Sequence, residues 1–103
     1  MLDGKYEDIL LGIKKALEYM NKNVSYRDGS LIWTSVDGYH IGKLGGIKPD
    51  DTWFPKIDWL LANGYIVQGK PQWCDITQSY VETYGLTIKG NKYIERNVWK
   101  EIR

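Results

Sequence analysis

The chain has 103 residues, of which 43% are hydrophobic and 26% are charged, and its formal net charge is +1. This composition predicts one folded domain over residues 1–103 with its own hydrophobic core, and it excludes a disordered chain. A net charge so close to zero gives no general attraction to nucleic acid.

The first predicted element is an amphipathic helix over residues 4–21. Steps of about 100° per residue place eight apolar side chains on one stripe. They are Leu2, Tyr6, Ile9, Leu10, Ile13, Ala16, Leu17 and Met20. Asp3 is the candidate N-cap, and Glu7 suits the positive end of the helix dipole. Leu11 falls on the polar face, as a tolerated surface residue or as a contact point.

The next segment has two interpretations. β-branched and aromatic residues favour a strand over Ser30–Ser35. Residues 37–44 then form either a short helix that turns Ile41 and Leu44 inward, or a β-hairpin that turns at Asp37-Gly38. We prefer the helix, because Ile-Gly-Lys-Leu-Gly-Gly-Ile resembles the end of the first helix of a helix-turn-helix.

A further helix is expected over residues 52–63, capped by Asp51 or Thr52 and ended by Gly64. Its predicted inward stripe is Trp53, Phe54, Ile57, Leu60 and Leu61. Its predicted outward face is Thr52, Pro55, Lys56, Trp59, Ala62 and Asn63. Among these outward residues, only Thr52, Lys56 and Asn63 are of types that commonly read base edges.

A long β-hairpin is expected over residues 65–86. Its arms are Tyr65–Gln68 and Ile76–Leu86, and its tip carries Lys70 and Trp73. A tryptophan at such a tip either folds back on the sheet or anchors a partner.

The last helix is expected from its N-cap Thr87 to about residue 102, with Ile94, Val98 and Ile102 inward. The rest of its surface includes five basic side chains within about 80° of one another. This basic patch is Lys89, Lys92, Arg96, Lys100 and Arg103. It is either a solvated helix face or a binding surface for phosphates or for an acidic protein.

Two stretches carry a family resemblance. Leu60-Leu61-Ala62-Asn63-Gly64-Tyr65-Ile66 and Tyr84-Gly85-Leu86-Thr87-Ile88-Lys89-Gly90 resemble the L-x-x-x-G-y-I and y-x-L-T-x-K-G punctuation of MarR- and PadR-type regulators. The resemblance covers less than half of the chain. It implies an α+β winged helix-turn-helix with a C-terminal helix, in which residues 52–63 are the recognition helix and the hairpin is the wing. It also implies a DNA-binding transcriptional regulator, commonly a homodimer.

The distribution of charge weighs against simple DNA binding. Residues 49–88, the expected recognition helix and wing, carry two basic and five acidic side chains, a net charge of −3. The net charge is +1 over residues 1–48 and +3 over residues 89–103. DNA affinity comes mostly from neutralising phosphates, so the acidic segment lacks much of that contribution.

Two functions therefore stay open. In the first, the chain binds double-stranded DNA with Thr52, Lys56, Asn63 and the wing. In the second, it binds a protein, for example as a phage or mobile-element product that inhibits a host protein. That contact face would be Trp59, Trp73, Asp50, Asp51 and Asp58.

Other classes of function are not expected. No nucleophile–base pair, carboxylate cluster or phosphate-binding glycine loop indicates an enzyme or a cofactor, and residues 42–46 indicate only a turn. His40 and Cys74 are the only histidine and the only cysteine, so neither a metal site nor an intrachain disulfide is predicted. No apolar run approaches the roughly 18 residues of a membrane span, and a cytoplasmic location is expected.

Overall fold

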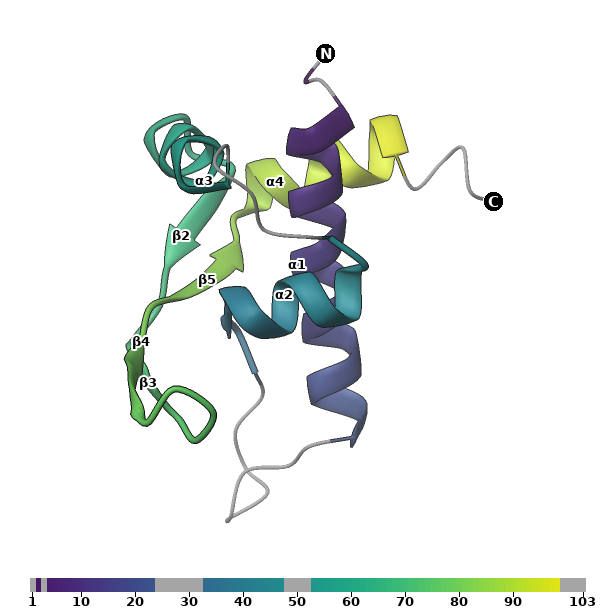
Figure 1. Ribbon diagram of the computed structural model, residues 1–103. Coiled ribbons are helices and arrows are strands. Elements are labelled where there is room, and N and C mark those ends of the chain that lie inside the picture. Colours follow the sequence, from purple (N-terminus) through teal and green to yellow (C-terminus); the bar gives the residue numbers. More distant parts are fainter. Residues whose placement is uncertain (1, 3, 24–32, 48–52, 99–103) are drawn as a thin grey trace.

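The computed structural model describes residues 2, 4–23, 33–47 and 53–98. The fold is α+β, with helices packed around a short antiparallel sheet (Figure 1). The elements in chain order are α1 (Gly4–Asn23), β1 (Val36–Asp37), α2 (Gly38–Gly45), α3 (Trp53–Ala62), β2 (Ile66–Gln68), β3 (Gln72–Cys74), β4 (Ser79–Val81), β5 (Thr83–Leu86), α4 (Ile88–Tyr93) and the π-helical turn η1 (Ile94–Val98).

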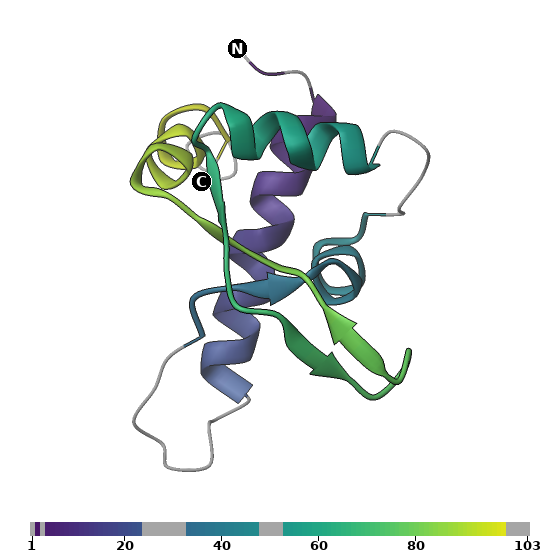
Figure 2. The ribbon, with the colours of Figure 1, turned by 90° about the vertical axis from the view of Figure 1, so that its left-hand side faces the viewer.

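The strands form two antiparallel sheets, and β2 to β5 make one long hairpin. In the three-stranded sheet the order is β1–β5–β2, with Val36 opposite Tyr84 and Ile66 opposite Leu86. In the two-stranded sheet β3 pairs with β4, so that Trp73 lies opposite Tyr80. The hairpin extends away from α3 and α4, past the end of α2 (Figure 2).

A β-bulge separates the β2–β5 pairing from the β3–β4 pairing. Gln68 lies opposite Tyr84 but Gln72 lies opposite Val81, so three residues on one arm face two on the other. The extra residue bends the hairpin and increases its twist. Thr83 fixes the bulge from the opposite arm: its carbonyl accepts from the Gly69 N–H at 2.9 Å, and its hydroxyl donates to the Lys70 carbonyl at 2.9 Å.

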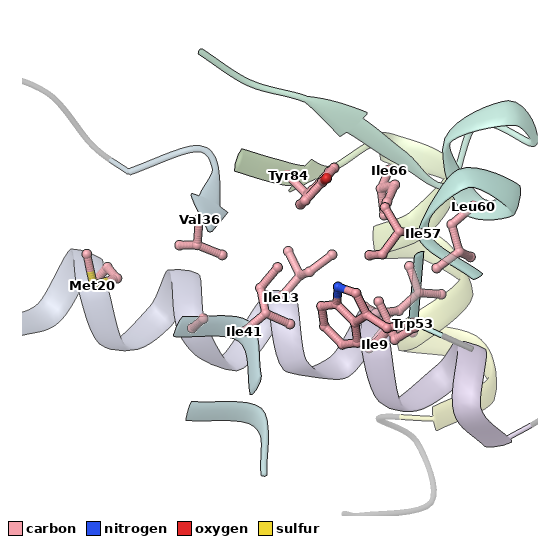
Figure 3. Close-up of a cluster of buried hydrophobic side chains, with 13 residues drawn as sticks. Ile9, Ile13, Met20, Val36, Ile41, Trp53, Ile57, Leu60, Ile66 and Tyr84 are labelled. Carbon is pink, nitrogen blue, oxygen red and sulfur yellow. The ribbon is translucent and has the colours of Figure 1, made fainter. Parts of the chain in front are cut away.

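The hydrophobic core lies between α1, the inner face of the sheet and α3 (Figure 3). α1, whose predicted stripe is largely confirmed, supplies five of the thirteen buried side chains, more than any other element. The buried members are Ile9, Leu10, Ile13, Ala16, Met20, Val36, Ile41, Trp53, Ile57, Leu60, Ile66, Tyr84 and Ile94. Leu11 also packs against this core, which favours a contact over a bare surface position.

α1 and α2 meet backbone to backbone at two glycines. A Cβ atom on Gly45 would lie 2.5 Å from the Cα of Gly12, and a Cβ on Gly12 would lie 2.8 Å from the Cδ1 of Ile47. Only glycine at position 45 permits so close an approach of the two backbones, whereas the atom nearest a Cβ on Gly12 is the end of a flexible side chain. The next residue, Gly46, ends α2 in the left-handed conformation with φ of 71°, so the turn expected within residues 42–46 occurs only at their end.

The structure decides between the alternatives for residues 30–45. The helix is confirmed as α2, and a hairpin at Asp37-Gly38 is wrong. The strand was misplaced, because residues 33–35 form none and the ladder is made by Val36–Asp37. Pairing with β5 and burial of Val36, rather than intrinsic propensity, select the strand residues. Residues 30–32 lie outside the described part of the chain.

The prediction that Phe54 faces inward is wrong, since 68% of its surface is exposed. The buried stripe of α3 is narrow, formed by Trp53, Ile57 and Leu60, with Leu61 partly buried beside it. Phe54 lies about 100° around the helix from Trp53, beyond the edge of that stripe.

The predicted hairpin tip is also wrong. Trp73 lies within β3, and the chain reverses at residues 75–78, where Gln78 has a positive φ of 55°. Gly69 and Pro71 mark the bulge instead of the turn, because a missing N–H and a missing side chain are tolerated at bulges. Trp73 packs edge to face with Tyr80 across the hairpin, 5.4 Å between ring centroids.

The last helix begins as predicted but changes form. Thr87 is its N-cap, and its hydroxyl accepts from the Gly90 N–H at 3.0 Å. After Tyr93 the helix continues as the π-helical turn η1, with Ile94 fully buried. The side chain of Val98, and residues 99–103 with Ile102, lie outside the described part.

Candidate functional site

Four aromatic rings form a row across α1, α3 and α4. The Trp59 ring lies 5.0 Å from Tyr6 and stacks at 5.9 Å on Tyr65, with an interplanar angle of 15° to the latter. Tyr65 in turn meets Tyr93 edge to face at 5.8 Å. Contacts of this kind contribute beyond simple burial of area, so the row fixes how these three helices sit together.

Basic side chains cover this row. The Lys56 ammonium lies 5.2 Å from the Tyr6 ring centre, and that of Lys89 lies 4.3 Å from the Tyr65 ring centre. Both distances are within the range of cation–π attraction. Lys92 and Arg96 line, with Lys89, a shallow depression of about 430 Å³ over Tyr65 and Tyr93. We call this the basic–aromatic surface: Lys56, Trp59, Asn63, Tyr65, Lys89, Lys92, Tyr93 and Arg96.

The start of α4 is held against the end of α3 by short-range contacts. The Thr87 hydroxyl lies 2.6 Å from the Gly64 carbonyl and 3.0 Å from the Tyr65 carbonyl, so it donates to this turn while capping α4. A Cβ atom on Gly90 would lie 2.1 Å from the Tyr65 carbonyl oxygen, which makes glycine necessary there. These contacts place Lys89 next to the C-terminal end of α3.

Tyr93 connects the surface to the N-terminal helix. Its hydroxyl donates to the Glu7 carboxylate at 2.6 Å and accepts from the Leu2 N–H at 2.9 Å. Burial, and then the hydrogen bond to Glu7, raise the pKa of Tyr93. The phenol therefore stays protonated and keeps its role as a donor at neutral pH.

Six of the predicted site residues come together on the basic–aromatic surface: Lys56, Trp59, Asn63, Lys89, Lys92 and Arg96. Two others, Lys70 and Trp73, lie apart from them on the hairpin, at and beyond the bulge. The remaining predicted residues lie outside the described part: Thr52, Asp50, Asp51, Lys100 and Arg103. Asp58 is exposed on α3.

Trp59 was predicted on the outward face of α3, and the structure confirms that it is exposed there. The residue is 38% exposed, and its ring also contacts Tyr6 and Tyr65, which the sequence did not indicate. Neither tyrosine was predicted as a site residue. Tyr65 directly follows Gly64, the residue at which α3 ends, and its ring packs back against Trp59 of α3.

A second surface lies at the other end of α3. Figure 2 shows the N-terminal end of α3, α2 and the hairpin on one side of the molecule, and α4 at the opposite end of α3. A groove of about 390 Å³, within the range of ligand pockets, lies between the N-terminal end of α3, the start of α2 and the hairpin. We call it the hairpin groove; its main lining residues are Asp37, Tyr39, Trp53, Phe54, Cys74, Val81, Glu82 and Tyr84.

Polar chemistry near this groove is limited. The Asp37 carboxylate, 7% exposed, lies 2.5 Å from Nδ1 of His40. His40 thus has a structural partner one helical turn away. Within residues 4–23, 33–47 and 53–98, no three His, Cys, Asp or Glu side chains form a potential metal site. In the same ranges, no helix is long and apolar enough to cross a membrane.

Comparisons with protein-family models, curated proteins and solved structures found no match to this chain.

Proposed function

We propose that the chain is a winged-helix DNA-binding protein that contacts duplex phosphates through the basic–aromatic surface. The element order supports a winged helix: helix, strand, two helices, hairpin, helix, with sheet order β1–β5–β2. In this interpretation α3 is the recognition helix, and β2 to β5 form the wing. The resemblance of the segments around Gly64 and Thr87 to MarR- and PadR-type regulators supports the same proposal.

The observation that carries the DNA proposal is the convergence of four cations from two helices. Lys56 comes from α3, whereas Lys89, Lys92 and Arg96 come from α4 and η1. Because the aromatic row lies beneath them, the cations are spread over one face. Lysine and arginine held in this way neutralise phosphates and release counterions, which supplies most non-specific DNA affinity.

The exposed face of α3 offers few side chains that could read base edges. The exposed residues of α3 include Phe54, Pro55, Asp58 and Ala62. None of these side chains is a donor that reads a guanine or adenine edge, and the Asp58 carboxylate repels phosphate. We therefore expect binding that depends weakly on DNA sequence.

A salt series on a short duplex of arbitrary sequence tests this function. The logarithm of the association constant should fall linearly with the logarithm of salt concentration. In the double variant Lys92→Gln/Arg96→Gln, the magnitude of that slope should decrease by about 2. The control Lys22→Gln/Lys43→Gln removes the same charge from exposed sites on α1 and α2 and should keep most of the slope. Absence of duplex binding at low salt would rule out DNA binding.

Protein binding is the second candidate, favoured by one specific observation. The outer face of α3 and the hairpin expose large apolar side chains, with Phe54 at 68%, Ile76 at 64% and Tyr80 at 73%. Exposed apolar clusters of this kind are typical of contact surfaces. A homodimer through this face is the simplest version, and sedimentation of the wild type beside Tyr80→Ser tests it.

A further inference from the structure

The hairpin groove has exposed apolar side chains at its edge and two buried aromatic residues, Trp53 and Tyr84, as its floor. Trp53 and Tyr84 are 6% and 8% exposed, whereas Phe54 at 68% and Tyr39 at 45% stand open to solvent. An exposed phenylalanine beside a concave apolar surface is unfavourable in water and is relieved when another apolar side chain covers it. The groove therefore suits one apolar side chain of another molecule.

The charge around the groove is negative. Its described lining includes the carboxylates of Asp37 and Glu82 and contains no lysine or arginine. Asp58 is exposed on the next turn of α3 after Phe54. Burial, and then the negative charges of Glu82 and Asp58, raise the pKa of Tyr84. His40 contacts Asp37, and Lys43 stands 5.7 Å from the Tyr39 ring, so the Glu82 side is the more acidic one.

We propose that the hairpin groove binds an exposed segment of a partner protein in which an apolar side chain lies next to lysine or arginine. The apolar side chain lies against Phe54 and the floor residues, and the basic neighbour faces Glu82 and Asp58. Charge complementarity selects this partner over an acidic segment and over DNA, because like charges in contact oppose binding. The groove is at the opposite end of α3 from the basic–aromatic surface, so this proposal is independent of DNA binding.

Two labelled peptides of equal length test the proposal by fluorescence anisotropy. The probe is Lys-Arg-Phe-Leu-Lys-Arg, and the comparison peptide is Glu-Asp-Phe-Leu-Glu-Asp. The wild-type protein should bind the basic peptide at least about tenfold more tightly than the acidic one. Equal binding of the two peptides, or binding of neither, would overturn the proposal.

Two variants at exposed positions localise the binding without disturbing the core. Glu82→Lys should reverse the preference between the two peptides, and Phe54→Ser should weaken the basic peptide about tenfold. The matched control Glu18→Lys makes the same charge change on α1, where the Glu18 side chain is 56% exposed. If Glu18→Lys weakens binding as much as Glu82→Lys does, the attraction is general and the groove is not the site.

Cys74 gives a readout at the groove itself. It is the only cysteine of the chain and lines the groove at 8% exposure. Saturating basic peptide should slow its alkylation by iodoacetamide at least about threefold, as expected when a bound segment excludes reagent. An unchanged rate would place the peptide elsewhere. A dimer that is abolished by Phe54→Ser would show that a second copy, rather than a different protein, occupies the groove.

Discussion

The ammonium group of Lys89 donates a hydrogen bond to the main-chain carbonyl of Asn63 at 2.8 Å. Asn63 follows α3, whose last carbonyls have no partner within the helix. A lysine of the proposed DNA-contacting face thus also binds the carbonyl at the end of α3. Replacement of Lys89 should therefore change both DNA binding and the stability of the fold, and each needs its own measurement.

Replacement of Lys89 by methionine should lower the free energy of unfolding by about 1 kcal/mol, through loss of the hydrogen bond and of the cation–π contact with Tyr65. For a chain of this size, the melting temperature should fall by about 4–8 °C. Lys92→Met on the same helix is the control and should melt as the wild type does. Equal melting of all three proteins would show that the Lys89 contact contributes nothing to stability.

Gly45→Ala should destabilise the fold by about 1–3 kcal/mol, the usual cost of overpacking. The added methyl group would lie 2.5 Å from the Cα of Gly12, so α1 and α2 must separate. Gly4→Ala, where nothing lies within 4 Å of the new Cβ, is the matched control. Urea unfolding of both variants measures the difference, and a wild-type midpoint for Gly45→Ala would contradict the backbone contact.

Gly64→Val should destabilise the chain by about 1–2 kcal/mol or more, for a different reason. Gly64 has φ of 76°, and no atom lies within 4 Å of a Cβ placed there. The cost therefore comes from the left-handed backbone alone, which a β-branched residue adopts poorly. Gly64→Asn, which tolerates this conformation better, should recover much of the loss in a thermal melt.

Trp59→Ala should lower the stability of the fold as well as binding to a partner. Removal of the ring leaves Tyr6 and Tyr65 without their common neighbour, at a cost of about 2 kcal/mol. Trp59→Phe keeps an aromatic ring there and should lose less than half as much. If Trp59→Ala melts as the wild type does while association with a partner falls, the internal stack is energetically unimportant.

The reactivity of Cys74 should depend on Thr77. Hydrogen bonds from the Thr77 main-chain N–H and from its hydroxyl hold the pKa of the Cys74 thiol below its usual value. Thr77→Val removes the second of these bonds, so the pKa should rise and less thiolate should be present at neutral pH. The midpoint of the alkylation rate against pH should move upward. The chain unfolded in guanidinium, which lacks both bonds, should have a still higher midpoint.

Periodicity identified the elements whose burial follows one helical stripe. The stripe of α1 and the positions of Ile57 and Leu60 in α3 could be read from spacing alone. Local chemistry likewise identified Thr87 as an N-cap and Gly64 as a helix end. Each of these features depends on residues within a few positions of one another.

Features that depend on distant residues could not be read in this way. The width of the buried stripe, and hence the exposure of Phe54, is set by what packs against α3. The bulge near Gly69 is defined by its pairing with Thr83 on the other arm. For the same reason, the sequence showed Lys56 and the basic patch as separate sets, although the rings of Tyr6, Trp59 and Tyr65 connect them.

The hydroxyl of Tyr93 joins Leu2 and Glu7, across sequence separations of 91 and 86 residues. During translation, α1 is made before this partner, which follows Glu7 by 86 residues in the sequence. Until then, η1, which packs against α1 in the folded protein, is also missing, so that part of α1 is not yet covered. Late closure of this kind lengthens the period in which a nascent chain can aggregate or meet a chaperone.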